Sequence, residues 1–328
     1  MRSSSAYRKI GITLRPTGAL PALLRQIMQR YKGRSFSFLA KEEKRLHNIA
    51  KIFPCTFYPA EKFYTVNDAL ITLGGDGTLI SAFRHASLPR PIFSINLGRL
   101  GFITQFTPAE TFPYLTAALA GKLVKNVVHH YQITIKQNGK NVFTSYFVND
   151  AVISQREISR MITLDVMAEP TPQERATRKM ANLSRATRIS CCKNETIYRL
   201  AGDGLIVSTP LGSTAYSLAA GGPILHPDVA ATLLTPICPH SIFTRPMAIG
   251  LQQAIIIKIP TDEVPLSLTL DGQEVLSLNR NMEIKIKRHP TRAYAYWLNP
   301  RYDFFKTVKE KFLHNQEFWV TSKAEIRP

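Results

Sequence analysis

The most constraining feature of this sequence is a glycine-rich turn between a short apolar run and a helical run. The turn is Leu73-Gly74-Gly75-Asp76-Gly77-Thr78-Leu79. The apolar run Ala69 to Leu73 reads as a buried strand, and apolar residues recur at helical spacing from Leu79 to Ala86. The turn therefore lies at the carboxyl end of a strand, where open α/β sheets bind ligands. There glycines let backbone N–H groups approach an anion, and a helix N-terminus favours negative charge.

Asp76 is the unusual member of this turn, because a carboxylate repels phosphate. Its presence is explained if it accepts a proton from an attacking hydroxyl or helps to hold a metal ion. A plain Asp-Gly turn explains the same residues, since glycine-rich turns between strands and helices are common. The turn alone leaves both interpretations open.

Length and composition favour two domains and no membrane segment. The chain has 328 residues, 45% hydrophobic and 20% charged, enough for one large core or two moderate ones. No apolar run approaches the roughly 18 to 20 residues of a membrane span, and Met1 to Arg8 lacks the apolar core of a signal peptide. Cys55 and Cys238 are isolated, Cys191 and Cys192 are adjacent, and no CxxC pair occurs. We therefore expect a cytoplasmic protein with reduced thiols.

The formal net charge of +19 raises the question of nucleic-acid binding. The charge is concentrated in two places: residues 1–51 contain 12 Lys or Arg against 2 Glu, and residues 171–200 contain 7 against 2. No RNA-recognition or zinc-finger signature accompanies either cluster. Solvated basic faces that attract anionic substrates are the simpler explanation.

The first part of the chain, from Arg8 to Gly121, has an α/β pattern in which helical stretches alternate with short apolar strands. The predicted strands are Lys9 to Leu14, Ala69 to Leu73 and Pro91 to Asn96. A helix is predicted with Thr107 as N-cap, Pro108 in its first position, Glu110 completing a capping box and Gly121 just past its end.

From about Asn126 the period changes to two, which predicts an all-β second domain. The predicted strands are Gln132 to Gln137, Val142 to Ile153, Met161 to Met167, Gly204 to Ser208, Gln253 to Ile259, Pro265 to Leu270 and Met282 to Lys287. From Ala293 the spacing becomes helix-like and aromatic around Tyr302, Phe304, Phe305, Val308 and Phe312. We expect this tail to pack back on the first domain.

Within the β half, one stretch is rich in groups that suit a polar ligand. Gly202-Asp203-Gly204 precedes a strand that ends in Ser208-Thr209-Pro210-Leu211-Gly212-Ser213-Thr214-Ala215-Tyr216-Ser217, followed by Gly221-Gly222-Pro223. Hydroxyls and free N–H groups at a strand end can bind such a ligand, and Tyr216 offers a flat face to a base. A structural turn rich in Ser and Thr has a similar composition.

Several catalytic templates are absent from the sequence. It contains no GxxxxGK[ST], GxGxxG or GxSxG, which excludes a P-loop, an ordinary Rossmann fingerprint and a nucleophile elbow. The eight histidines form no HExxH or paired metal spacing. His226 and His240 lie in proline-rich segments, where a structural role is the simpler interpretation.

Taken in order, the motifs resemble those of the NAD kinases. They are Gly74-Gly75-Asp76-Gly77-Thr78, Asn96-Leu97-Gly98-Arg99-Leu100-Gly101-Phe102, Asn149-Asp150, Asp203-Gly204-Leu205-Ile206-Val207-Ser208-Thr209-Pro210, Gly212-Ser213-Thr214-Ala215-Tyr216 and Leu234-Thr235-Pro236-Ile237-Cys238-Pro239-His240. The resemblance runs from about residue 69 to 305 and is weak over the first 60 residues.

The resemblance implies a Rossmann-like α/β N-terminal domain followed by a β-sandwich domain, with the active site in the cleft between them. We place the domains at 1–125 and 126–292, with 293–328 as a C-terminal tail returning to the first domain. The implied reaction is phosphorylation of the 2′-hydroxyl of the adenosine ribose of NAD to give NADP. The donor is ATP or, in some members, inorganic polyphosphate, with a divalent metal, Mg²⁺ foremost. A cytoplasmic homo-oligomer, dimer or tetramer, is also implied.

Residue roles follow from the same resemblance. Asp76 is the expected general base, because a hydroxyl must lose its proton as it attacks phosphorus. The expected phosphate-donor turn comprises Gly74, Gly75, Gly77 and Thr78. The expected NAD-binding residues are Asp76, Gly77, Asn149, Asp150, Arg160, Asp203, Thr214, Ala215, Tyr216, Ser217, Leu218, Ala219 and Gln273, some of which contact a neighbouring subunit's ligand in oligomeric relatives.

Three positions or stretches depart from the family pattern. Leu211 replaces a threonine of many relatives, and Ala201 stands where some carry arginine, although Arg199 is nearby. The stretch 168–198 is longer and more basic than the usual hairpin. We hypothesise that this basic insertion attracts polyphosphate or the partner subunit's ligand.

Two other functions compete with this one. A lipid kinase of the diacylglycerol type shares the GGDGT turn and the two-domain plan, although Asn149-Asp150 and the stretch Gly212 to Tyr216 argue against it. The other alternative is a basic nucleic-acid-binding protein that uses the net charge of +19.

Overall fold

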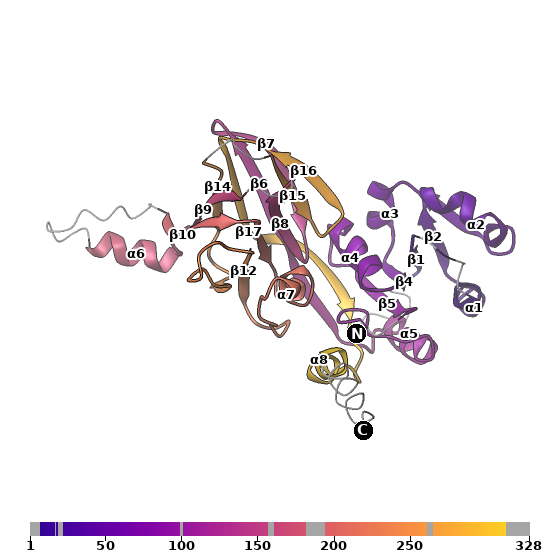
Figure 1. Cartoon of the computed structure of the whole chain (residues 1–328). Coiled ribbons are helices and arrows are strands. Elements are labelled where there is room, and N and C mark those ends of the chain that lie inside the picture. Colours follow the sequence, from indigo (N-terminus) through magenta and orange to yellow (C-terminus); the bar gives the residue numbers. More distant parts are fainter. Residues whose placement is uncertain are drawn as a thin grey trace, which may run out of the picture. The chain divides into compact units, whose positions relative to one another are not determined.

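A computed structural model describes residues 7–16, 18, 22–98, 101–156, 161–181, 194–260 and 265–312. The chain divides into two compact units (Figure 1). Unit 1 comprises Met1–Val128 and Ala293–Pro328, and unit 2 comprises His129–Arg292. Within the described residues, no helix is both long and apolar enough to cross a membrane.

Unit 1 contains a parallel sheet in the order β5-β4-β1-β2-β3, the order of Rossmann-like folds. The strands are β1 Lys9–Leu14, β2 Ser35–Leu39, β3 Cys55–Tyr58, β4 Ala69–Gly74 and β5 Pro91–Asn96. Every residue of β4 and β5 is buried, as in strands covered on both faces. The end of β17 (Met282–Trp297) pairs in parallel with β5, with Ala295 opposite Pro91. The predicted strands of this half are confirmed, and β4 is one residue longer than predicted.

Helices cover both faces of this sheet. They are α1 Ala22–Arg30, α2 Glu43–Ala50 after the 3₁₀ turn η1 Ala40–Glu42, α3 Ala60–Val66, α4 Asp76–His85 and α5 Thr111–Leu119. Side chains of α1, α2 and α5 share one apolar cluster with Ile71 and Phe93 of the strands. Gly11 points to the other face, where an added Cβ would lie 2.7 Å from the Phe63 ring of α3. The two faces thus have separate helix layers.

Two helices begin at residues other than those predicted. α4 begins at Asp76, so the expected turn residue is already helical. α5 begins at Thr111, because Thr107 does not cap it: the Thr107 hydroxyl donates to the Glu110 carboxylate at 2.9 Å and so caps no backbone N–H. The predicted contact from Glu110 to the Thr107 N–H is present at 3.1 Å, and Gly121 ends the helix with φ +74°.

Unit 2 is a sandwich of two sheets. One is antiparallel, in the order β13-β12-β11-β8-β15-β16, and the other contains β10, β9, β14 and β17 together with β6 and β7. The strands are β6 Lys125–Gln137, β7 Lys140–Phe147, β8 Asp150–Gln155, β9 Ile162–Ala168, β10 Glu195–Gly202, β11 Gly204–Ser208, β12 Ala231–Ile237, β13 Met247–Gly250, β14 Ile255–Lys258, β15 Leu266–Leu270 and β16 Glu274–Leu278. A single apolar cluster contains Ile133 and Leu164 from one sheet and Ile153 and Leu205 from the other. This shared core confirms the predicted all-β half.

One predicted strand, Val142 to Ile153, is two strands that belong to different sheets. β7 pairs with β6, whereas β8 pairs with β11 and β15. The chain changes sheet at Val148 and Asn149, which alternation alone does not reveal because both strands face the same core.

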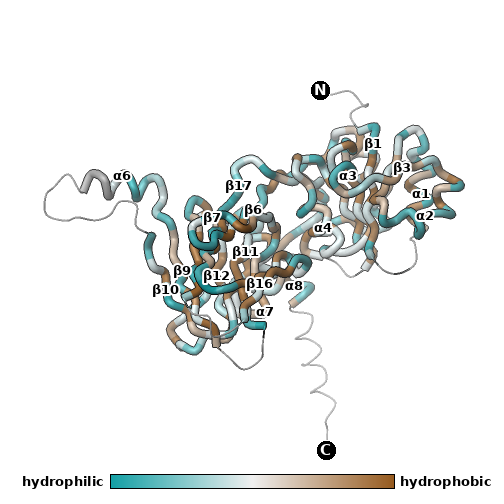
Figure 2. Tube along the Cα trace, turned by 90° about the horizontal axis from the view of Figure 1, so that it is seen from above, coloured by the Kyte–Doolittle hydropathy of each residue, from teal (hydrophilic) through white to brown (hydrophobic). Residues whose placement is uncertain are grey.

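The remaining elements are short. In unit 2 the 3₁₀ turn η2 Leu211–Thr214 leads into α7 Tyr216–Ala219. α6 Pro172–Ala181 lies in the long basic stretch, and its residues 172–177 are mainly hydrophilic (Figure 2). In unit 1 the tail forms the end of β17 and α8 Phe304–Phe312, as predicted for a tail that returns to the first domain.

Candidate functional site

Asp76 lies at the carboxyl edge of the unit 1 sheet, as the first residue of α4. A Cβ at Gly74 would lie 2.2 Å from the Thr78 hydroxyl, so the close turn requires glycine there. A Cβ at Gly75 or Gly77 would meet no described atom within 4 Å. Packing therefore does not explain these two glycines, and the predicted phosphate-donor turn leaves open space at the start of α4.

The loop after β5 holds the Asp76 carboxylate. Oδ2 accepts the N–H of Phe102 at 2.9 Å, while Oδ1 accepts the N–H and hydroxyl of Thr104 at 2.9 and 2.7 Å and the N–H of Ile103 at 3.4 Å. A Cβ at Gly101 would lie 2.0 Å from Oδ1, so only glycine fits beneath this carboxylate. A carboxylate oxygen has about two lone-pair sites. Oδ1 is saturated, whereas Oδ2 has one hydrogen-bond donor among the described residues.

In unit 2, Asn149 and Asp150 lie where the chain changes sheet, and both are buried. Asp271 fixes their backbone: its Oδ1 accepts the N–H groups of Val148, Asn149 and Asp150 at 3.2, 2.7 and 3.2 Å. Asn149 Oδ1 is buried without a hydrogen-bond partner among the described residues. Such a group is costly unless a ligand or water donates to it.

The Asp150 carboxyl is in an unusual electrostatic environment. Burial, followed by the negative charge of Asp271, raises the pKa of Asp150 to about 7. Near neutral pH the carboxyl is therefore present in both protonation states and is able to donate or accept a hydrogen bond.

Thr209 joins the predicted Ser/Thr-rich loop to the Asn149 turn. Its hydroxyl donates to Val148 O at 2.6 Å and accepts the Gly212 N–H at 3.1 Å, and its N–H donates to Asn149 O at 2.9 Å. A Cβ at Gly212 would lie 2.1 Å from Asn149 O. The structure thus brings the start of this loop against Asn149 and Asp150, two regions separated by about sixty residues in the sequence.

The predicted residues that follow in the loop differ in their accessibility. Tyr216 is 48% exposed and presents its ring to solvent, and Thr214, Ala215, Leu218 and Ala219 are partly or fully exposed. The Thr214 hydroxyl donates to Leu211 O at 3.3 Å. Ser217 is buried, and its hydroxyl lies 2.7 Å from that of Thr235. Ser217 therefore has an internal partner, whereas Tyr216 is available to a ligand.

Asp203 is not at this position in the fold. Asp203 precedes β11, and the register of β11 on β8 places Ser208, not Asp203, opposite Asp150. Asp203 Oδ1 instead accepts from Gln155 Nε2 at 3.2 Å. Gln273 is exposed in the turn after β15. Arg160 lies outside the described residues.

Comparison with known proteins identifies the family. Residues 20–123 match the ATP-NAD kinase N-terminal domain and residues 148–298 match the ATP-NAD kinase C-terminal domain. The chain is 30% identical over 325 residues to the NAD kinase of Acinetobacter baylyi, covering 97% of this chain and 95% of that protein. The chain belongs to the NAD kinase family. It is also 35% identical over 245 residues to the NAD kinase of Desulforamulus reducens, covering 74% of this chain and 76% of that protein.

Solved structures agree with this family in fold. The chain is similar to yeast NADH kinase complexed with NADH, with a TM-score of 0.78 and 21% identity over 93% of this chain and 87% of that one. It is also similar to an NAD kinase from Archaeoglobus fulgidus in complex with ATP, with a TM-score of 0.64 and 19% identity over 92% and 98% of the two chains. The predicted fold class is confirmed. The lipid-kinase and nucleic-acid alternatives are not supported, because both parts of the chain match NAD kinases.

The family departures occupy distinct places. Leu211 lies in η2, where its carbonyl accepts the Thr214 hydroxyl. Arg199 makes a bidentate ion pair with Asp165 across β10 and β9, at 2.6 and 3.1 Å. This pair lowers the pKa of Asp165, mainly through the hydrogen bond. On α6, Arg175 lies 3.4 Å from Glu169, while the side chains of residues 178–181 lie outside the described ones.

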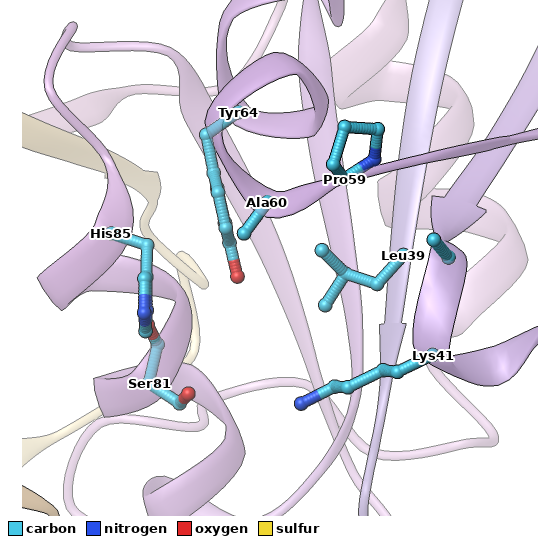
Figure 3. Close-up of a pocket in the computed structure, with 8 residues that line it drawn as sticks. Leu39, Lys41, Pro59, Ala60, Tyr64, Ser81 and His85 are labelled. Atoms are coloured by element: carbon cyan, nitrogen blue, oxygen red, sulfur yellow. The ribbon is translucent and has the colours of Figure 1, made fainter.

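A cavity of about 240 Å³ also occurs in unit 1, at the carboxyl ends of β2 and β3 (Figure 3). Leu39, Lys41, Tyr64, Ser81 and His85 are among its lining residues. The Tyr64 and His85 rings stack with centroids 5.4 Å apart. The cavity contains none of the predicted site residues, so the predicted chemistry is not located there.

Four residues of this arrangement were absent from the predicted set. Gly101 belongs to a quoted motif, but its role depends on a contact with Asp76, as does that of Thr104. Thr209 was part of the Ser/Thr-rich stretch without a separate role. In the sequence, Asp271 is 121 to 123 residues away from the N–H groups that donate to it. The only local signal in the sequence is the Asp-Gly turn that Asp271 begins.

Proposed function

We propose that this chain transfers a phosphoryl group from ATP to the 2′-hydroxyl of the adenosine ribose of NAD, producing NADP. The observation that carries the proposal is the oriented Asp76 carboxylate at the start of α4, within a chain that belongs to the NAD kinase family. In phosphoryl transfer the protein contributes mainly positioning and electrostatic stabilisation. Four donors from one loop supply such positioning to Asp76.

Asp76 Oδ2 is the proposed proton acceptor. Oδ1 has its acceptor sites filled by Thr104 and Ile103, whereas Oδ2 retains a lone-pair site beside the Phe102 N–H. The ribose hydroxyl would lose its proton to Oδ2 as its oxygen forms a bond to the terminal phosphorus of ATP. The bond between that phosphorus and the ADP oxygen breaks in the same step, and ADP leaves. General-base assistance of this kind contributes about 10²- to 10⁴-fold in rate.

Unit 2 supplies the proposed dinucleotide-binding groups. The unpartnered Asn149 Oδ1 suits an amino or hydroxyl donor, and Asp150 is able to accept or donate near neutral pH. The exposed Tyr216 ring suits a stacked base. Thr214, Ala215 and Ser217 are proposed to shape the loop that presents Tyr216. Thr214 and Ala215 make contacts within the loop, and the Ser217 hydroxyl contacts Thr235 of β12.

The divalent metal is proposed to enter with the donor. Among the described residues, no group of three or more His, Cys, Asp or Glu side chains forms a metal cage. Mg²⁺ usually keeps several waters and binds through one or two carboxylates plus substrate phosphates. Asp76 is the one predicted site carboxylate of unit 1, so such an ion would be held mainly by the donor's phosphates, where it would neutralise negative charge on the transferring group. The open turn at Gly75 and Gly77 is proposed to receive the phosphates of ATP or polyphosphate.

A homo-oligomer located in the cytoplasm completes the proposal. Asp203 and Asp150 lie at opposite ends of the paired strands β11 and β8, so one copy does not bring them together within unit 2. We propose that Asp203 serves the ligand of a neighbouring subunit. Light scattering after size-exclusion chromatography is expected to give at least a dimer, and a monomer that is fully active would contradict this assembly.

The decisive assay is NADP formation from NAD with ATP and Mg²⁺, repeated with polyphosphate as donor. Asp76→Asn is expected to lose roughly two or more orders of magnitude in kcat while staying folded, because the amide cannot accept the proton. Folded wild-type protein that makes no NADP with either donor would refute the proposal.

A further inference from the structure

We infer that the C-terminal segment, residues 299–312, positions Asp76, and that Asn299 and Tyr302 are positioning residues for phosphoryl transfer. The inference deepens the proposed function and rests on it. All the contacts that carry it lie within unit 1.

Tyr302 reaches Asp76 through a single intervening residue. The Tyr302 hydroxyl donates to Phe102 O at 2.8 Å, and the Phe102 N–H donates to Asp76 Oδ2 at 2.9 Å. Burial raises the pKa of Tyr302 to about 12, and the nearby Asp76 charge acts in the same direction. The hydroxyl therefore remains a donor throughout the physiological pH range.

Asn299 holds the other end of the same loop. Its N–H donates to Gln105 Oε1 at 3.0 Å, and its Nδ2 donates to Gln105 O at 2.8 Å. Asn299 and Gln105 are 6% and 7% exposed, so water has little access to replace these bonds. Buried amides that lose their partners are unfavourable, which fixes the register of the segment on the loop. Gln105 directly follows Thr104, the main donor to Asp76 Oδ1.

The Phe102 side chain is held by the same segment. Its ring stacks with that of Phe312 at a centroid distance of 5.8 Å and contacts that of Phe304 at 6.4 Å. The Lys311 ammonium lies 4.3 Å from the ring centroid, close enough for a cation–π interaction. Both the backbone and the ring of Phe102 are thus held by residues about 200 positions later in the chain.

The consequence for the reaction is geometric. The loop orients the Asp76 carboxylate and leaves Oδ2 as the accepting oxygen. A displacement of about 1 Å in a reacting group can cost about 100-fold in rate. Loosening the segment should therefore reduce kcat through Asp76, with little change in the affinity for either substrate.

The test compares Tyr302→Phe and Asn299→Ala with a matched control, Tyr31→Phe. Tyr31 is in the same unit and its hydroxyl also has a partner, Thr116 Oγ1 at 2.7 Å, but it does not contact the Asp76 loop. For Tyr302→Phe we expect kcat for NADP formation to fall about tenfold, with KM for NAD and ATP changed less than about twofold. Backbone hydrogen exchange at Phe102 and Thr104 should accelerate, and Tyr31→Phe should leave kcat and this exchange unchanged.

A double mutant provides the second readout. If Tyr302 acts through Asp76, Tyr302→Phe should cause no further loss of kcat in the Asp76→Asn background. Three results would overturn the inference: a full tenfold loss in the Asp76→Asn background, an unchanged kcat in Tyr302→Phe alone, or unchanged hydrogen exchange at Phe102. The proposed function would still stand in each case, provided that wild-type protein forms NADP. Wild-type protein that makes no NADP refutes the proposed function instead, and the exchange measurement still decides whether the segment holds the loop.

Discussion

At the scale of single residues, position 101 requires glycine because of neighbouring side chains, not because of its own backbone conformation. An added Cβ would lie 2.0 Å from Asp76 Oδ1 and 2.3 Å from Thr104 Oγ1, far inside contact distance. We therefore expect Gly101→Ala to displace the carboxylate and to lower kcat by about 100-fold, as for other displacements of about 1 Å. Gly33→Ala is the matched control, because a Cβ there meets nothing within 4 Å. Equal activity in the two variants, measured as NADP formation, would contradict the close contact.

Asp150 predicts a dependence of stability on pH. Its pKa is about 7 in the folded protein and near the ordinary 3.8 when unfolded, so the folded state binds more protons between these values. Stability should consequently fall as pH rises from about 4 to about 7 and then level off. Asparagine at position 150 does not titrate, so Asp150→Asn should not lose stability in this way. The Tm of the variant should therefore exceed that of wild type by an amount that grows as pH rises from about 4 to about 7.

Thermal unfolding measured from pH 4.5 to 8 tests this expectation. Asp228→Asn is the control, because its side chain is 82% exposed. A Tm difference between Asp150→Asn and wild type that does not depend on pH would show that Asp150 titrates normally.

At the scale of elements, the turn between β15 and β16 supports the crossing from β7 to β8. Asp271 in that turn accepts three backbone N–H groups at the crossing, and it adopts φ +51°. Aspartate and asparagine tolerate this backbone conformation better than most residues. The proposed binding residues Asn149 and Asp150 are thus held by an element that is distant in sequence.

Substitutions at Asp271 separate charge from hydrogen bonding. Asp271→Ala should destabilise the protein by about 2 to 3 kcal/mol, because buried N–H groups lose their acceptor, and it should raise KM for NAD. Asp271→Asn keeps an acceptor oxygen and the favourable φ, so a smaller effect is expected. Urea unfolding and steady-state kinetics provide the comparison, and equal losses in both variants would indicate that charge, not acceptor geometry, is what matters.

At the scale of the whole molecule, the net charge of +19 should affect anionic substrates more than the fold. Neutralising Arg175, Arg178 and Lys179 on α6 should raise KM for polyphosphate and flatten its dependence on salt, because attraction is screened over about 10 Å at 0.1 M. KM for NAD, which carries less charge, should change less. Kinetics at 50 and 300 mM KCl would refute a role for α6 if the triple variant matched wild type with every donor.

The sequence alone determined the fold class, the family and the local elements whose signals are contiguous. Alternating apolar strands and helices identified unit 1, the change to period two identified unit 2, and the glycine-rich turn located Asp76 at a strand end. Local patterning determines these features, because burial on one or both faces imposes its period on neighbouring residues. The sequence did not determine where α5 begins, because the Thr107 hydroxyl bonds to Glu110 instead of capping the helix.

Only the tertiary structure decided which distant groups support the site residues. The supporting contacts join segments that are about 25 to 200 residues apart in the sequence. They are the contacts of Gly101 and Thr104 with Asp76, of Asp271 with Asn149, and of Tyr302 with Phe102. It also separated Asp203 from Asp150 through the register of β11 on β8. Hydrogen-bond partners are chosen by position in space after the sheets have formed, and a turn such as Asp271-Gly272 has the same local sequence whether or not it holds another strand.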